Sequence, residues 1–239
     1  MMGDNSITSL PRQSGLLETA QIIANNIANA STPGFKAEGP IFAEYVSASA
    51  NRQPSTSIGH LVGHSTDFSG GAFEKTGNTF DFGIEGDGFF KVTTPGGDRL
   101  TRAGVFQLDP NGMIADAMGN TLQDEGGSAI QIPPDAVSIA VARDGTLSVD
   151  GEIFGNVGVF EPIGEMERAG ANQWVALDGD RLKGDATILQ GFVEQSNVSP
   201  VLEFAKLISA QRLYEAGQTM AEQEHDRLSS LINAIRQQG

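Results

Sequence analysis

The stretch from Asn197 to Arg236 reads NVSPVLEFAKLISAQRLYEAGQTMAEQEHDRLSSLINAIR, and it predicts one long α-helix. Steps of three and four residues keep one line of side chains on the same edge of such a helix, the narrow seam of a coiled coil. The seam consists of Phe204, Leu207, Gln211, Tyr214, Gln218, Ala221, His225, Leu228, Ile232 and Ile235. Asn197 or Ser199 can cap the helix start. A helix of this length is about 55–60 Å long and is not stable alone in water, so the seam is expected to pack on another surface.

The other end of the chain has a second helical pattern, over residues 12–30. Its apolar positions repeat at the same steps and include Leu16, Ala20, Ile23, Ile27 and Ala30. Pro11 is expected to mark its start, because a proline is tolerated in a first turn but costs about 3 kcal/mol in a helix interior. The turn Ser31-Thr32-Pro33-Gly34 ends it. The two terminal helices are therefore expected to pack together as a hairpin or on neighbouring molecules.

Between the helices the pattern changes to short apolar runs separated by glycine-rich turns. Asp109-Pro110-Asn111-Gly112 and Arg143-Asp144-Gly145 are typical hairpin turns. The expected fold class is α+β, mainly β, with an antiparallel β domain inserted between terminal helices that form a coiled-coil-like layer. The expected segments are an N-terminal helix over 1–36, an extended connector over 37–79, the β domain over 80–196 and the long helix over 197–239.

Composition excludes several classes of function. The formal net charge is −15, and residues 1–39 and 201–239 together hold only eight acidic and six basic side chains, so the middle of the chain is strongly acidic. Such a surface cannot neutralise phosphates, which argues against nucleic acid as a partner. The absence of cysteine excludes disulfide and thiolate chemistry. We expect no membrane span and no cleavable secretory signal, because no long apolar run occurs.

No group of residues predicts catalysis, a metal or a cofactor. His60 and His64 precede Asp67 at metal-ligand spacing, but Gly59 and Gly63 disfavour a helix there and no fourth ligand is evident. The Asp109 turn lacks the glycine and the closing glutamate of a calcium loop. We therefore expect a protein that is not an enzyme.

One contiguous stretch, from Ile23 to Lys36, reads IANNIANASTPGFK and resembles the N-terminal signature of bacterial flagellar rod and hook proteins. Residues 85–90, 101–106 and 109–122 resemble the β domain of the same family. Residues 194–198 and 207–215 resemble its C-terminal signature. The length and the start of the chain look most like the proximal rod members.

This resemblance implies a structural subunit of the flagellar basal-body rod, the drive shaft that transmits torque. It implies export through the flagellar type III apparatus into the periplasm, and assembly with copies of itself and with other proximal and distal rod proteins. The residues expected to lie at subunit interfaces are Leu16, Ile23, Asn25, Asn26, Ile27, Asn29, Pro33, Gly34, Phe35, Asn197, Phe204, Leu207, Ile208, Arg212, Tyr214, Leu228 and Ile232. The amides of Asn25, Asn26 and Asn29 are expected to bond across subunits.

Three alternatives remain open. A distal rod protein of the same family has similar motifs but is usually slightly longer. A secreted binding module, with a β head on a helical stalk, would explain the long helix and the acidic middle but not the Asn-rich signature. A cell-wall hydrolase would need a carboxylate pair or a metal cluster, and the sequence offers neither.

Overall fold

The computed structural model describes residues 4–47, 56–170 and 172–237. The chain divides into two compact units. Unit 1 comprises residues 1–28, 37–67 and 198–239, and unit 2 comprises residues 29–36 and 68–197. The chain therefore passes between the units four times, after residues 28, 36, 67 and 197.

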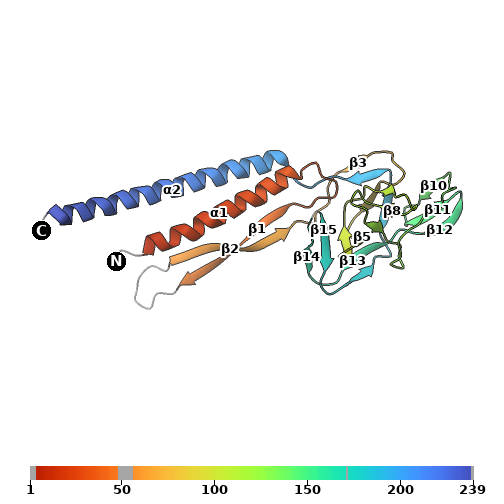
Figure 1. Cartoon of the computed structure of the whole chain (residues 1–239), viewed down its shortest axis with the longest axis horizontal. Helices are drawn as coiled ribbons and strands as arrows, with labels where there is room; N and C mark the ends of the chain where they lie inside the picture. The colour runs from red at the N-terminus through yellow and green to blue at the C-terminus, as the bar shows by residue number, and fades with distance from the viewer. Residues whose placement is uncertain (1–3, 48–55, 171, 238–239) are drawn as a thin grey trace. The chain divides into compact units, whose positions relative to one another are not determined.

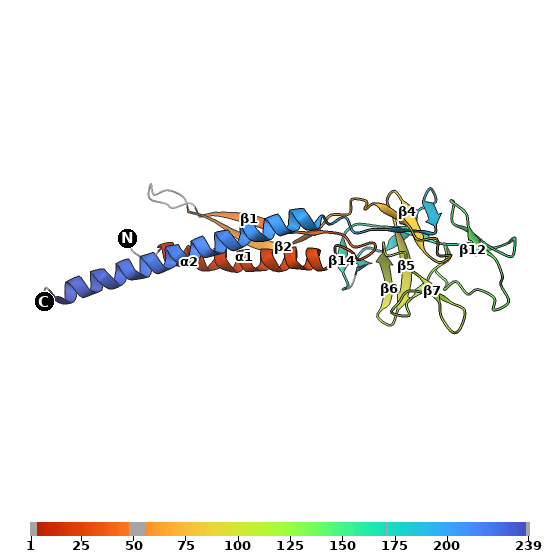
Figure 2. The same cartoon turned by 90° about the horizontal axis from the view of Figure 1, so that it is seen from above.

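Unit 1 consists of two helices and one β-hairpin (Figures 1 and 2). Helix α1 spans Asp4–Ala28 and helix α2 spans Pro200–Gln237. The helices pack against each other in antiparallel directions, as expected for the two ends of the chain. The Ser199 carbonyl accepts the Glu203 N–H at 3.0 Å at the start of α2, where Pro200 occupies the first turn that suits a proline.

The start of α1 differs from the expectation. The helix begins at Asp4 and continues through Pro11, which was expected to mark its first turn. A proline inside a helix removes one backbone hydrogen bond and crowds the preceding turn, but tertiary packing can offset that cost. Pro11 is therefore an interior residue of α1.

The connector expected over 37–79 is also different, because much of it forms a hairpin in unit 1. Strands β1 (Glu38–Ser47) and β2 (Thr56–Thr66) pair antiparallel, with a bulge between Ile41 and Phe42. Both strands pack against α1. Glycine, serine and histidine residues in β2 weaken its own β preference, and pairing with β1 and packing on α1 stabilise the strand.

Unit 2 is the antiparallel β domain. Its main sheet has the strand order β14-β15-β6-β5-β9-β8-β7, and β13 joins it by pairing with both β5 and β16. The strands are β3 (Phe73–Lys75), β4 (Phe82–Glu85), β5 (Phe89–Thr94), β6 (Gly97–Thr101), β7 (Gln107–Leu108), β8 (Ile114–Ala115), β9 (Thr121–Leu122), β10 (Ile139–Val141), β11 (Thr146–Val149), β12 (Glu152–Asn156), β13 (Val159–Pro162), β14 (Met166–Arg168), β15 (Gln173–Ala176), β16 (Asp180–Leu182), β17 (Thr187–Gln190) and β18 (Phe192–Glu194). Smaller sheets pair β10-β11-β12, β17-β4 and β18-β3.

The core of unit 2 is made of aromatic and branched side chains from these strands. One cluster includes Phe82, Phe90, Ile114 and Leu122, none of which is exposed. A second, smaller cluster surrounds Trp174 and includes Phe89, Leu100 and Phe160.

Three turns of unit 2 share one construction, in which an aspartate carboxylate accepts backbone N–H groups. Asp109 accepts from Asn111 and Met113, each at 2.8 Å, and the Gly112 N–H donates to the Asp109 carbonyl at 3.0 Å. The expected turn at residues 109–112 is therefore confirmed. Asp116 and Asp124 begin turns of the same Asp-x-x-Gly pattern.

Candidate functional site: a buried ion-pair cluster and the helix surfaces

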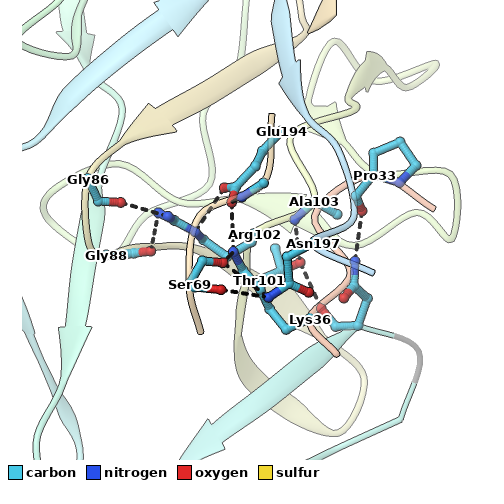
Figure 3. Close-up of polar contacts among 12 residues, drawn as sticks. Pro33, Lys36, Ser69, Gly86, Gly88, Thr101, Arg102, Ala103, Glu194 and Asn197 are labelled. Atoms are coloured by element: carbon cyan, nitrogen blue, oxygen red, sulfur yellow. Dashed lines mark hydrogen bonds and ion pairs between the residues drawn. The ribbon is translucent and has the colours of Figure 1, made fainter. Parts of the chain in front are cut away.

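Three charged side chains meet inside unit 2: Lys36, Arg102 and Glu194, called here the ion-pair cluster (Figure 3). Oε1 of Glu194 lies 2.6 Å from the Lys36 ammonium and accepts the Gly71 N–H at 2.8 Å. Oε2 of Glu194 lies 3.0 Å from Nε of Arg102. Exposure of these three side chains does not exceed 5%. Both oxygens of the carboxylate are thus paired away from water.

The remaining donors of Arg102 shape the turn that follows β4. Nη1 donates to the Gly88 carbonyl at 2.7 Å, and Nη2 donates to the Gly86 carbonyl at 2.6 Å. Both glycines have positive φ, 90° at Gly86 and 121° at Gly88, which other residues rarely adopt. Glycine at these positions lets two carbonyls turn toward one guanidinium.

Lys36 and Asn197 share a backbone partner at Ser69. The Lys36 ammonium donates to the Ser69 carbonyl at 2.7 Å, and the Asn197 amide donates to the same carbonyl at 3.2 Å. In sequence, these three residues stand within two positions of three of the passages between the units. Inside unit 2, the cluster therefore joins segments that are far apart along the chain.

The electrostatics of the cluster depend on its burial. Burial lowers the pKa of Arg102, while the nearby charges of Glu194 and Asp87 act in the opposite direction. A guanidinium nevertheless stays charged in proteins. Removing one partner of a buried ion pair costs about 3–5 kcal/mol, because the other charge is left without compensation. Glu194 is therefore needed by both cations, because it is the carboxylate that pairs with each of them.

The residues of the turn after α1 lie within the same unit. The Pro33 carbonyl accepts the Asn172 amide at 2.8 Å, and the Gly34 N–H donates to the Glu194 carbonyl at 2.7 Å. Phe35 is 1% exposed, and the Arg168 guanidinium lies over its ring at 5.2 Å. The expectation that Gly34 and Phe35 contact other subunits does not fit this arrangement, because their own chain covers both. Pro33 is half-buried, and for it the expectation stays a prediction.

The three asparagines of the signature have different surroundings. Asn26 is buried in unit 1 and its amide makes three hydrogen bonds within the chain: to the Glu38 carbonyl at 2.8 Å, from the Glu38 N–H at 2.9 Å and to Oε2 of Glu203 at 3.2 Å. The expected bond across subunits is therefore wrong for Asn26 as the structure places it. Asn25 is exposed and Asn29 is half-buried, and for both the expectation stays a prediction.

The buried edge of α2 lies one residue away from much of the expected seam. The less exposed positions of its first turns are Glu203, Leu207, Ala210, Tyr214 and Gly217, again at steps of four and three. Phe204, which the seam placed inside, is 52% exposed, and Gln211 and Gln218 are exposed as well. Because Glu203, Ala210 and Gly217 are charged or small, an apolar pattern does not find this edge.

The other expected interface residues differ in exposure between the two helices. On α1, Ile23 is buried and Leu16 and Ile27 are half-buried. On α2, Ile208, Arg212 and Ile232 are exposed. The side chain of Leu228 lies outside the described residues.

Chemistry beyond ion pairing is sparse. In the described ranges, no group of three or more His, Asp or Glu side chains is arranged to hold a metal ion. His64 lies 3.8 Å from Glu18 and 3.9 Å from Glu38, within unit 1. Neither described helix is long and apolar enough to cross a membrane.

Three family models match the chain. Residues 19–36 match the flagella basal body rod protein model, residues 83–149 match the D1 domain of the flagellar hook protein FlgE/F/G, and residues 189–234 match the C-terminal region of the flagellar basal body rod FlgEFG protein. The flagellar basal-body rod protein FlgF of Mesorhizobium japonicum is 36% identical over 221 residues, which cover 90% of each chain. The chain belongs to the flagellar basal-body rod protein family. The expected resemblance is confirmed.

Further members of the rod family extend the comparison. FlgF of Caulobacter vibrioides is 34% identical over 97% of this chain and 98% of its own length. The rod protein FlgG of Bacillus subtilis is 32% identical over 90% of this chain and 92% of its own.

The segments matched to the rod family each supply one charge of the ion-pair cluster. Lys36 ends the first match, Arg102 lies in the second and Glu194 in the third. The family motifs in the sequence include all three charged residues, but the sequence alone predicted no role for them. The sequence carries no local signal for the pairing, because Lys36 and Glu194 are 158 positions apart.

Proposed function

We propose that this chain is a structural subunit of the bacterial flagellar rod, placed in the proximal part of the drive shaft. The observation that carries the proposal is its similarity to FlgF relatives over nearly the whole chain. The proposed role is to transmit torque through packed subunits rather than to catalyse a reaction, so no cofactor is involved. Its location would be the rod of the basal body, in the periplasm.

Exposed apolar side chains on α2 support assembly through the helices. Val201, Leu202, Phe204, Ile208, Leu213, Met220 and Ile232 are each at least half exposed. Fully burying an exposed side chain of this kind contributes about 1.5–3 kcal/mol, so covering the exposed parts of several of them favours association. We propose that neighbouring subunits cover these side chains in a coiled-coil-like layer. A contact of this kind that does not close into a ring produces a helical rod.

The partners in this proposal are copies of the same chain and the other proximal and distal rod proteins. The flagellar type III export apparatus would deliver the subunit. A distal position is the second candidate, and the similarity to FlgG over most of both chains favours it. The two positions differ in where rod growth stops without the subunit.

Electron microscopy of purified basal bodies tests the proposal. The gene is deleted in the source organism and restored on a plasmid as a control. We expect rings without a complete rod in the deletion strain, and complete rods after restoration. Growth that stops near the base supports the proximal position, and growth that stops further out supports the distal one. Complete rods and hooks in the deletion strain would overturn the proposal.

A further inference from the structure

Among the described residues, the helices α1 and α2 include two buried polar side chains that bond to each other, Asn26 and Glu203. Around them, the buried side chains are apolar or small, such as Ile22 and Ile23 on α1 and Ala210 on α2. Apolar contacts have no preferred direction, and a helix pair that slides by one turn, about 5.4 Å, can form similar ones. Apolar packing alone therefore specifies the axial register of the helices weakly.

The hydrogen bonds of the Asn26 amide supply the directional contact that apolar packing lacks. The amide bonds both backbone groups of Glu38, at the start of β1, and it donates to Oε2 of Glu203 on α2 at 3.2 Å. One side chain of α1 thus joins three elements of unit 1. Three of the four hydrogen-bonding positions of this amide are occupied.

Glu203 is held from a second side. It is 5% exposed, and its Oε1 accepts from the Lys206 ammonium at 2.5 Å, one turn along α2. A slip of α2 along α1 would break the Asn26–Glu203 bond, so that the amide would keep only its bonds to Glu38 and the carboxylate only its pair with Lys206. Leaving buried polar groups unpaired is unfavourable, and fixing register is the best-attested use of such groups in helix pairs.

We propose that Asn26 and Glu203 are positioning residues that fix the axial register of α2 on α1. This inference rests on the proposed function, because the register decides at what height the exposed apolar face of α2 meets neighbouring subunits. Neither residue contacts a neighbour in this mechanism. They act through the position of Phe204, Ile208 and the other exposed residues of α2.

Spin-label distances test the register in the isolated full-length chain. The chain has no cysteine, so cysteines placed at Leu17 on α1 and Ile232 on α2 are labelled selectively. Both positions are more than half exposed. Leu17 and Ile232 are about 30 Å apart along the helix axes, counted from the Asn26–Glu203 contact, so a slip of one turn changes the label distance by about 5 Å.

The variants separate polar pairing from other effects. Glu203→Leu removes the acceptor, Glu203→Gln keeps an acceptor oxygen for Asn26, and Glu215→Leu makes the same exchange at an exposed position of α2. We expect one narrow distance in the parent, Glu203→Gln and Glu215→Leu, and a second population shifted by about 5 Å in Glu203→Leu. Circular dichroism checks that α2 is folded. If Glu203→Leu does not fold, Asn26→Asp replaces it, because an aspartate keeps the acceptor for the Glu38 N–H and loses the donors to Glu203 and to the Glu38 carbonyl.

The rod provides the second measurement. Glu203→Leu is expected to reduce incorporation into basal bodies at least tenfold, and Glu203→Gln is expected to restore it. An unshifted, narrow distance in the folded Glu203→Leu chain would overturn the register proposal and leave the proposed function standing. A broad distance in the parent would overturn it as well, because the contact would then not hold one register. A shifted distance with normal incorporation would overturn the link between register and assembly.

Discussion

Unit 2 and unit 1 differ in how far their large side chains are buried. Unit 2 encloses a core of aromatic residues and pairs its buried charges, Lys36 and Arg102, with Glu194. Among the residues of unit 1 whose burial is described, Ile22 and Ile23 are buried, whereas Phe204 and Ile208 on α2 are about half exposed. A unit with a closed core is stable through its own contacts, while a thin layer of helices gains stability when another surface covers it. Single substitutions should therefore change unfolding in unit 2 and assembly in unit 1.

The largest effect on unfolding is expected from Glu194→Ala in unit 2. The change leaves the Lys36 and Arg102 charges buried without a carboxylate, so the free energy of unfolding should fall by about 3–5 kcal/mol. Urea unfolding followed by tryptophan fluorescence measures it, because Trp174 is the single tryptophan and is buried in unit 2. Glu167→Ala, at an exposed position of β14, is the control. A fall of less than about 1 kcal/mol in the free energy of unfolding would mean that the cluster contributes little to the stability of unit 2.

A somewhat smaller loss is expected from Gly34→Ala. Gly34 has φ +68°, and a Cβ there would lie 2.3 Å from the Arg102 carbonyl carbon. Gly119 has a similar φ of +83° with open space around it, so Gly119→Ala isolates the backbone strain. Strain alone costs about 1–2 kcal/mol, and we expect about 3 kcal/mol at Gly34 because the backbone of Arg102 and Ala103 must also move. Equal losses at the two glycines in urea unfolding would show that the close approach is easily relieved.

A smaller and pH-dependent effect is expected from Asp109→Asn at the turn before β8. The backbone N–H of Met113 holds the pKa of Asp109 below its ordinary value of 3.8. A depressed pKa in the folded state stabilises the protein above the ordinary value, and this stabilisation is lost as the pH falls through the folded pKa. The free energy of unfolding should therefore be lower in the variant than in the parent at neutral pH. The two values should become equal at a pH well below 3.8. Asp135→Asn removes an exposed charge elsewhere and serves as the control. A difference that persists unchanged at low pH would contradict the electrostatic explanation.

The smallest effect on unfolding, and the sharpest contrast between the units, is expected from Ile208→Asp. Ile208 is 50% exposed, so its replacement should change the free energy of unfolding by less than about 0.5 kcal/mol. The same change should prevent incorporation into basal bodies, because a carboxylate would stand in the face that neighbours are proposed to cover. Leu177→Asp replaces a residue of similar exposure in unit 2, and rods should form normally. Normal incorporation of the Ile208 variant would exclude this part of α2 from the subunit contact.

The sequence predicted the elements that have strong local patterns. Helix α2 was expected over residues 197–236 and spans Pro200–Gln237, because its periodicity is long and Pro200 suits a first turn. The Asp109 turn follows from its own residues, since aspartate caps it and Gly112 has the positive φ it requires. Each of these signals lies within a few residues of the structure it specifies.

The features that were missed depend on distant partners. The seam included Phe204 rather than Glu203, because a periodicity argument assigns a charged residue to solvent unless a buried partner such as Asn26 is known. The β1–β2 hairpin was missed because it packs on α1, which its own sequence does not reveal. The ion-pair cluster was missed because nothing local links Lys36 to Glu194.

The separation of Lys36 and Glu194 also bears on the order of folding. Contacts between residues 158 positions apart form late, because a long loop must close before they are gained. A chain that emerges from a ribosome or a channel with its N-terminus first cannot complete the cluster until residue 194 has emerged. The turn after α1 has no carboxylate to bind until then. The last strand of unit 2, which ends at Glu194, must therefore be available before the ion-pair cluster can close.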